Sequence, residues 1–185
     1  MPQTRARRGS TLVEFALAAS FVLLPLVLGT MSIGMTMART IRINELTRDA
    51  AHMFARGVDF SQSANQSLLL DMATGLNITA TGGEGVIIFS GIQCTGTGQA
   101  VCTRRLVVGN SALHASDYAN PTQIDSSGNV NYTRDPGANA SSFLNVMPMS
   151  TGESTYVVET FYSSSDFDLT GFWNGSGTYT MAVFY

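Results

Sequence analysis

The hydrophobic pattern divides the chain into one long apolar run, an amphipathic stretch, and a distal region of short apolar segments. The run covers residues 9–38 and carries one charged side chain, Glu14, before Arg39 ends it. It exceeds the roughly 20 apolar residues that a helix needs to cross a bilayer. The pattern therefore predicts a transmembrane helix at residues 10–38, behind a basic leader peptide at residues 1–9.

Two features inside this run predict how the helix behaves. Pro25 lies about halfway along, and it predicts a kink near residues 21–25, because proline removes a backbone hydrogen bond and clashes with the preceding turn. Gly29, Ser32 and Gly34 are small, so they predict a face that another helix can approach closely.

Residues 39–58 continue the helix as an amphipathic extension. One face carries apolar residues at helical spacing, and these are Leu46, Ala50, Met53, Phe54, Gly57 and Val58. Charged residues occupy the other face, namely Arg42, Glu45, Asp49 and Arg56, together with His52. We therefore expect one helix that leaves the membrane, ends at about Gly57 and packs its apolar stripe on the distal domain.

The distal domain, residues 59–185, is predicted to be α+β. The polar segment after Asp59 offers Ser and Asn as helix caps, and a short helix is expected at residues 67–75. Five segments have the composition of strands in an antiparallel sheet: residues 76–80, 85–93, 101–108, 154–163 and 178–185. The fold class is thus a long N-terminal helix followed by a small domain with an antiparallel β-sheet.

Two polar segments of this domain have no clear periodicity. Residues 109–153 contain three prolines, and a stretch this long marks a binding loop, a mobile segment or an unrecognised element. The last two predicted strands are joined by a turn that is expected to be exposed and that holds Trp173.

The two cysteines flank a glycine-rich turn between two predicted strands. The basic leader favours a cytoplasmic N-terminus, which places Cys94 and Cys102 outside the cytoplasm. In an oxidising compartment two such cysteines predict a disulfide across the mouth of a hairpin, with a pair of free thiols as the alternative. Two cysteines supply too few ligands for a structural zinc site.

Composition gives no sign of catalysis, a cofactor or nucleic-acid binding. The chain has no lysine, and its net charge of −3 is too small to indicate a nucleic-acid partner. His52 and His114 have no nucleophile or metal-binding motif around them. Asp125, Ser127 and Asn129 resemble an oxygen-rich cation loop, but they lack EF-hand spacing and are explained by a turn. We expect no enzyme, no metal and no cofactor.

The most specific motif is RRGSTLVEF, residues 7–15. A basic stretch is followed by Gly9, and the fifth and sixth residues after that glycine are Glu14 and Phe15. This resembles the processing site of type IV pilins, and in particular the tight-adherence (Tad) subfamily. The segments LAASFVLLPLVLG and NELTRDAAHMFARG are similar to those of the minor pilins, or pseudopilins, called TadE-like or TadF-like.

The resemblance implies cleavage by a prepilin peptidase between Gly9 and Ser10. It implies roles for Glu14 and Phe15 in assembly, with other pilins and the pilus assembly platform as partners. The protein would then act in pilus assembly, adhesion or secretion, from the bacterial cytoplasmic membrane, with its C-terminal domain outside the cytoplasm. A small residue before the cut also suits a peptidase that reads extended backbone at the membrane face.

Physical chemistry independently requires an explanation for Glu14. A carboxylate inside a membrane segment is costly and usually pairs with another group or faces protein. Cleavage would create an ammonium group on Ser10, one helical turn away, which could neutralise it. Three alternatives remain open: an uncleaved signal anchor, a secreted domain cut after about Ala38, and a membrane-anchored binding domain that enters no filament. The residue found at the mature N-terminus distinguishes the cleaved pilin from all three.

Overall fold

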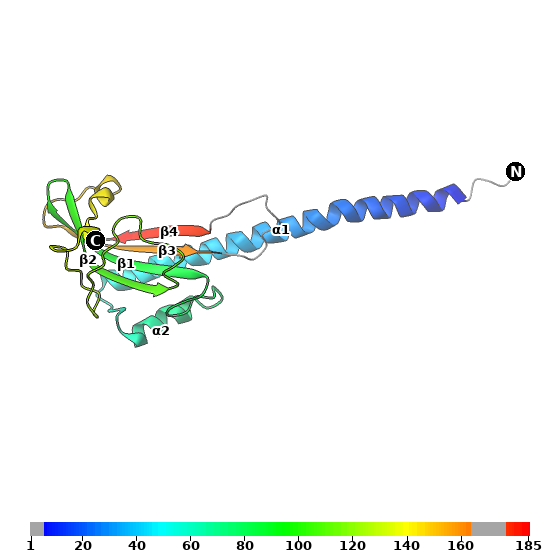
Figure 1. The fold of residues 1–185 in the computed structure, drawn as a ribbon. Coiled ribbons are helices and arrows are strands. Elements are labelled where there is room, and N and C mark those ends of the chain that lie inside the picture. Colours follow the sequence, from blue (N-terminus) through cyan, green and yellow to red (C-terminus); the bar gives the residue numbers. More distant parts are fainter. Residues whose placement is uncertain (1–5, 164–176) are drawn as a thin grey trace. The chain divides into compact units, whose positions relative to one another are not determined.

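The computed structural model describes the backbone of residues 6–163 and 177–185, with side chains from residue 11 onward. Two helices, two short 3-10 helices and four strands follow one another along these residues (Figure 1). In chain order they are α1 (Ala6–Ala55), α2 (Ser63–Met72), β1 (Gly85–Gly96), β2 (Gln99–Gly109), η1 (Pro136–Ala138), η2 (Ser141–Asn145), β3 (Ser154–Tyr162) and β4 (Thr178–Phe184). The expected α+β class is confirmed.

Helix α1 runs for 50 residues, without interruption at Pro25, and is shared between two units that meet at Arg39 and Thr40. Its end has a local cause. Gly57 has a φ of +87°, and the amides of Gly57 and Val58 donate to the carbonyls of Phe54 and Met53. This is the Schellman arrangement, in which a residue with positive φ satisfies the last carbonyls of a helix. The helix therefore stops where the sequence predicts.

The second unit, residues 40–185, is built around one antiparallel sheet with the strand order β2-β1-β3-β4. Strands β1 and β2 form a hairpin across Thr97 and Gly98, where Gly98 has a φ of +73°. Strand β3 then pairs with the free side of β1 and with β4, and Glu159 lies opposite Ile88 and Met181. The four strands predicted from residue 85 onward are all present.

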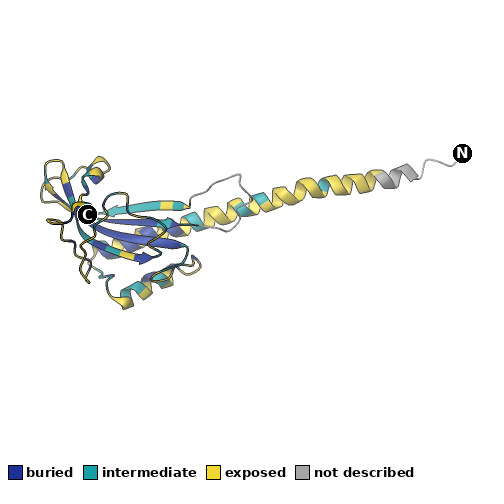
Figure 2. Ribbon diagram, viewed as in Figure 1, coloured by how far each residue is buried: buried dark blue, intermediate teal, exposed yellow. Residues whose placement is uncertain are grey.

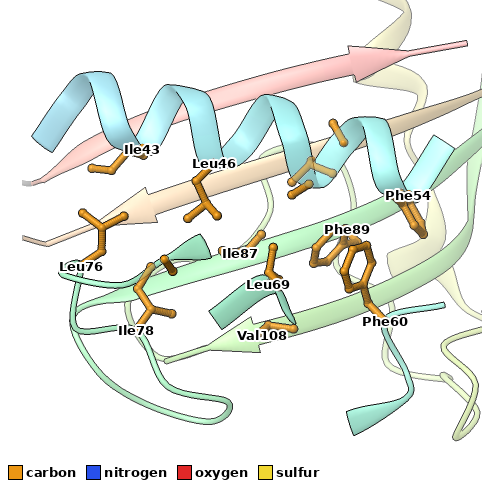
Figure 3. Close-up of a cluster of buried hydrophobic side chains, with 14 of the residues drawn as sticks. Ile43, Leu46, Phe54, Phe60, Leu69, Leu76, Ile78, Ile87, Phe89 and Val108 are labelled. Carbon is orange, nitrogen blue, oxygen red and sulfur yellow. The ribbon is translucent and has the colours of Figure 1, made fainter. Parts of the chain in front are cut away.

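One face of the sheet packs against the second part of α1 and against α2 (Figure 3). Ile43, Leu46 and Phe54 project from α1 towards Ile87 and Phe89 of β1. Phe54 meets Phe89 edge-on at 5.3 Å between ring centroids, while Phe60 stacks on Phe89 at 4.4 Å. The charged residues of the amphipathic stretch are exposed, as their positions predict.

The opposite face of the sheet is covered by the irregular segment between β2 and β3. Alternate strand residues point there and form a second cluster with Phe143 and several alanines; from the strands these are Ile92, Ala100, Cys102 and Val157. Since side chains alternate between faces along a strand, the two clusters lie on opposite sides of the sheet. Residues 109–153 are therefore neither a free loop nor a missed strand. They are the second outer layer.

Two local predictions are wrong. Residues 76–80 do not form a strand: Ile78 makes only an isolated bridge to Gly83, within a tight turn in which Asn77 has a φ of +45°. Helix α2 begins at Ser63 rather than at residue 67, and its N-cap, Gln62, makes no side-chain capping bond. Asn65 instead donates its side-chain amide to the carbonyl of Asp59, so the polar segment continues the helix instead of capping it.

Candidate functional site

The first unit presents an almost fully exposed apolar helix surface (Figure 2). Phe15, Phe21 and Met37 are 73%, 82% and 64% exposed. A helix with such a surface needs a non-aqueous environment, either lipid or other helices. Among the described residues, this is the single helix long and apolar enough to cross a membrane, and it fits a single-pass protein with a distal domain.

Helix geometry places Glu14 on a face that mixes small and large residues. At about 100° per residue, Ala18, Phe21, Pro25, Leu28 and Ser32 lie within about 40° of Glu14, and Gly29 lies within about 60°. Gly34 is five residues beyond Gly29, which rotates it by about 140°. The prediction that Gly29, Ser32 and Gly34 share one face is therefore wrong for Gly34, because α1 is continuous there.

Gly29 and Gly34 are not required by contacts inside the molecule. A Cβ atom placed on either glycine would meet no other atom of residues 6–163 and 177–185 within 4 Å. Any role for their small size lies in contacts with another molecule, where a missing side chain lets backbones approach closely.

Three hydroxyl groups in the apolar part of α1 are satisfied within the helix. Ser20 donates to the carbonyl of Ala16 at 2.8 Å, Thr30 to Val27 at 2.9 Å, and Thr36 to Ser32 at 3.0 Å. Such bonds let a polar side chain sit in an apolar environment without an external partner. Glu14 is thus the only ionisable side chain between residues 11 and 38.

The predicted processing junction lies inside α1. Gly9 and Ser10 both have helical backbone, three and four residues after the helix begins at Ala6. A peptidase that reads extended backbone would first have to unwind this turn. Helix ends fray readily, and glycine weakens a helix by about 1 kcal/mol relative to alanine, so Gly9 lowers the cost of unwinding.

The two cysteines are buried free thiols on neighbouring strands. Cys94 lies opposite Ala100, and Cys102 lies opposite Ile92, so they are diagonal rather than direct neighbours. Their thiols bond to different carbonyls, those of Gly96 and Arg104. A disulfide would need the two strands to adjust, because diagonal positions are typically about 7–8 Å apart. The disulfide stays a prediction.

Neither histidine forms a catalytic arrangement with a cavity. His52 packs on Phe184, with ring centroids 4.1 Å apart. The Nε2 atom of His114 lies 3.4 Å from Oδ1 of Asp117, and its ring stacks on Phe161. A shallow hollow of about 450 Å³ is lined by residues 122–125 and 129–131, and neither histidine lines it.

The loop that resembles a cation site uses its carboxylate internally. Oδ1 of Asp125 accepts hydrogen bonds from the amides of Ser127 and Asn129, both at 2.8 Å, and Oδ2 accepts from the side chain of Asn129 at 2.9 Å. These bonds lower the pKa of Asp125, and the side-chain bond from Asn129 contributes most. They account for the loop as a turn. Trp173 lies outside the described residues.

A buried polar network centred on Glu159 was not among the predicted sites. This residue of β3 is 1% exposed, and its carboxylate accepts three hydrogen bonds. The donors are the hydroxyl of Ser116 at 2.5 Å, the amide of Asp117 at 3.0 Å and the hydroxyl of Tyr179 at 2.9 Å. Burial, followed by the nearby Glu159 carboxylate, raises the pKa of Tyr179. A charged residue inside the apolar run VVETF was the available signal.

Comparison with known proteins identifies the N-terminal segment. Residues 9–52 match the model of the family described as TadE-like protein. The chain has no significant match among curated proteins or solved structures. The predicted resemblance to TadE-like pilins is therefore confirmed from Gly9 to His52, within α1, while the domain beyond α1 is described by its structure alone.

Proposed function

We propose that this protein is a minor pilin or pseudopilin of a Tad-type (type IVc) pilus. A prepilin peptidase would remove residues 1–9, leaving Ser10 as the mature N-terminus. The protein would be inserted once in the bacterial cytoplasmic membrane at residues 10–38, with residues 59–185 as an extracytoplasmic domain. Its work would be structural, in pilus assembly, adhesion or secretion.

One observation carries this proposal: Glu14, the only ionisable side chain between residues 11 and 38 of the exposed apolar stretch, lies five residues after Gly9, within the segment that matches TadE-like proteins. A simple anchor has no use for a carboxylate at this depth, because burying it in hydrocarbon costs several kcal/mol. A helix that packs against other helices can use it, since an ammonium group on Ser10 of the same or a neighbouring subunit would pair with it.

The remaining partners follow from this role. Other pilin helices would cover the apolar face of α1, and Phe15, which is 73% exposed, would lie among them next to Glu14. The second unit would present its surface outside the cytoplasm. The assembly platform would extract the subunit from the membrane.

Mass measurement of the mature N-terminus tests the proposal. The protein is expressed with and without its prepilin peptidase, and the first residue of the membrane fraction is identified. We expect Ser10 with the peptidase and an intact leader without it. An intact leader in both strains would favour a membrane-anchored binding domain, and a start near residue 39 would favour a secreted domain; either result refutes the proposal.

A Gly9 variant provides the matched control. Gly9→Phe places a bulky residue before the cut and should block processing, whereas Ala6→Phe introduces the same side chain three residues earlier. We expect cleavage to fail only in the first variant. Equal processing of both variants would contradict cleavage after Gly9.

A further inference from the structure

The outer layer on the second sheet face is attached mainly by polar contacts. Its first part, residues 110–140, is here named the strap; it lies between β2 and η2 and is drawn in yellow-green (Figure 1). The strap has no regular element longer than the three residues of η1. Its buried apolar side chains are Ala119, Val130, Ala138 and Ala140, all small, and the partly buried Tyr118 packs against Phe143 of η2. Little apolar area therefore holds it to the sheet.

The opposite face of the sheet is held very differently. There α1 and α2 contribute large side chains, including Leu46, Phe54 and Leu69, to a continuous cluster. Stability is not uniform within a domain, and segments with few buried apolar contacts open at lower free energy than the core. The two outer layers should thus differ in how readily they detach.

Hydrogen bonds hold the beginning of the strap at two buried side chains of the sheet. Glu159 accepts from the hydroxyl of Ser116 and the amide of Asp117. Arg105, which is 4% exposed, donates to the carbonyl of Ala119. Because these contacts are clustered within four strap residues, they form a single point of attachment.

Farther along, backbone bonds attach the strap to the edge of β2. Arg105 donates its amide to Gly128 at 2.7 Å, and Val130 donates to Thr103 at 2.9 Å. The middle of the strap is closed on itself by Asp135, which accepts from the amides of Thr122 at 2.5 Å and Gln123 at 2.7 Å. This part can therefore move as one piece.

The part of the sheet beneath the strap contains buried polar atoms that have no hydrogen-bond partner among the described residues. These include the hydroxyl of Ser90 and the Nε atom of Arg105. Buried polar atoms without partners are unfavourable, and access to water relieves them.

We propose that the strap opens as a unit while the α1 face of the sheet stays packed, and that Glu159 is the latch that holds it closed. Opening uncovers the part of the second cluster that the strap covers, in which Cys102 lies on β2, while Phe143 of η2 stays outside the strap. The device does not depend on the proposed pilus role, because every contact that carries it lies in the second unit.

Cys102 is a natural reporter of this opening. It is fully buried on the strap side of β2, and burial raises the pKa of its thiol, so the closed state is unreactive towards thiol reagents. Val108 is fully buried on the same strand but faces α1, so a thiol there reports on the other layer.

The experiment measures thiol labelling of the full chain in detergent micelles under native conditions. One protein carries Cys94→Ser and retains Cys102; its matched control carries Cys94→Ser, Cys102→Ser and Val108→Cys. We expect Cys102 to react at least about tenfold faster than the control thiol, with a weaker dependence on denaturant, as for local opening. Equal rates with equal denaturant dependence would mean that the sheet opens only by global unfolding, and would overturn the proposal.

Two further variants test the latch. Ser116→Ala and Tyr179→Phe each remove one hydroxyl from the Glu159 carboxylate, but only Ser116 belongs to the strap. Ser116→Ala should accelerate Cys102 labelling several-fold, with little change for Tyr179→Phe and none for the Val108→Cys thiol. Thermal melts establish that both variants are folded. Equal acceleration by the two variants, or none by Ser116→Ala, would refute the latch.

Discussion

The hydroxyl groups of Thr47 on α1 and Thr160 on β3 lie 2.8 Å apart, both completely buried. They form a polar contact inside the apolar layer that joins the helix to the sheet. Thr47 also bonds to the carbonyl of Ile43 at 2.7 Å. The pair favours one position of α1 along β3, because an offset of one residue would bury the Thr160 hydroxyl without its partner, whereas Thr47 would keep its bond to Ile43.

Removing one member of this pair should cost more than removing both. Thr47→Val leaves the Thr160 hydroxyl without its partner, and we expect a loss of about 1–3 kcal/mol in the free energy of unfolding. Thr47→Val combined with Thr160→Val should return to within about 1 kcal/mol of the wild type. Denaturant unfolding of the four proteins measures this, and strictly additive losses would contradict a direct interaction.

Two glycines should respond differently to alanine, although both have positive φ. At Gly57, with φ +87°, a Cβ would meet no atom within 4 Å, so Gly57→Ala should cost only the backbone conformation, about 1–2 kcal/mol. At Gly109, with φ +106°, a Cβ would lie 2.3 Å from the carbonyl oxygen of Gly85. Gly109→Ala should therefore cost at least about 3 kcal/mol. Thermal unfolding separates the two, and equal losses would contradict the predicted clash.

Asp135 should make the strap sensitive to acid. Hydrogen bonds from backbone amides, above all that of Gln123, lower its pKa in the folded state. A lowered folded pKa gives stability that is present above the unfolded pKa of about 3.9 and is lost as the pH falls through the folded value. Hydrogen exchange of residues 122–137 should accelerate, relative to its intrinsic rate, below about pH 4. Asp135→Asn should lack this step, so the same pH profile in the variant would assign it to another group.

Glu14 should matter for assembly and not for processing. Glu14→Ala keeps the Gly9–Ser10 junction, so the mature N-terminus should be unchanged, while the protein recovered with sheared pili should fall by about tenfold because the carboxylate–ammonium pair is lost. Glu45→Ala, the same change on the exposed face of α1 beyond the apolar run, is the matched control. Normal piliation in Glu14→Ala would remove Glu14 from the assembly role.

The sequence predicted those parts of the fold that local pattern determines. Helix α1 and the four strands follow from periodicity, and the end of α1 follows from Gly57. The predicted strand at residues 76–80 does not form, because Ile78 pairs only with Gly83 in an isolated bridge. Strand formation depends on pairing with a neighbouring strand rather than on composition. The layer at residues 109–153 could not be predicted, because contacts with Arg105 and Glu159, distant in sequence, hold it in place.

The candidate functional residues also differ in whether the sequence alone reveals their role. Glu14 was identifiable because a single charge in an apolar run is anomalous, whatever the tertiary structure. Glu159 was equally anomalous within β3, but its meaning depends on Ser116, which lies 43 residues earlier in the chain. Only the folded arrangement shows that this carboxylate is satisfied by hydrogen bonds.

The side-chain hydrogen bonds of Ser20, Thr30 and Thr36 lie within α1, so they do not depend on whether lipid or protein surrounds the helix. Each hydroxyl keeps the same acceptor whether its neighbour is an acyl chain or another protein helix. In the proposed role, the subunit can exchange lipid for protein without breaking a side-chain hydrogen bond in this stretch. Glu14 is then the one charged side chain between residues 11 and 38 whose surroundings would differ between lipid and a packed bundle of helices.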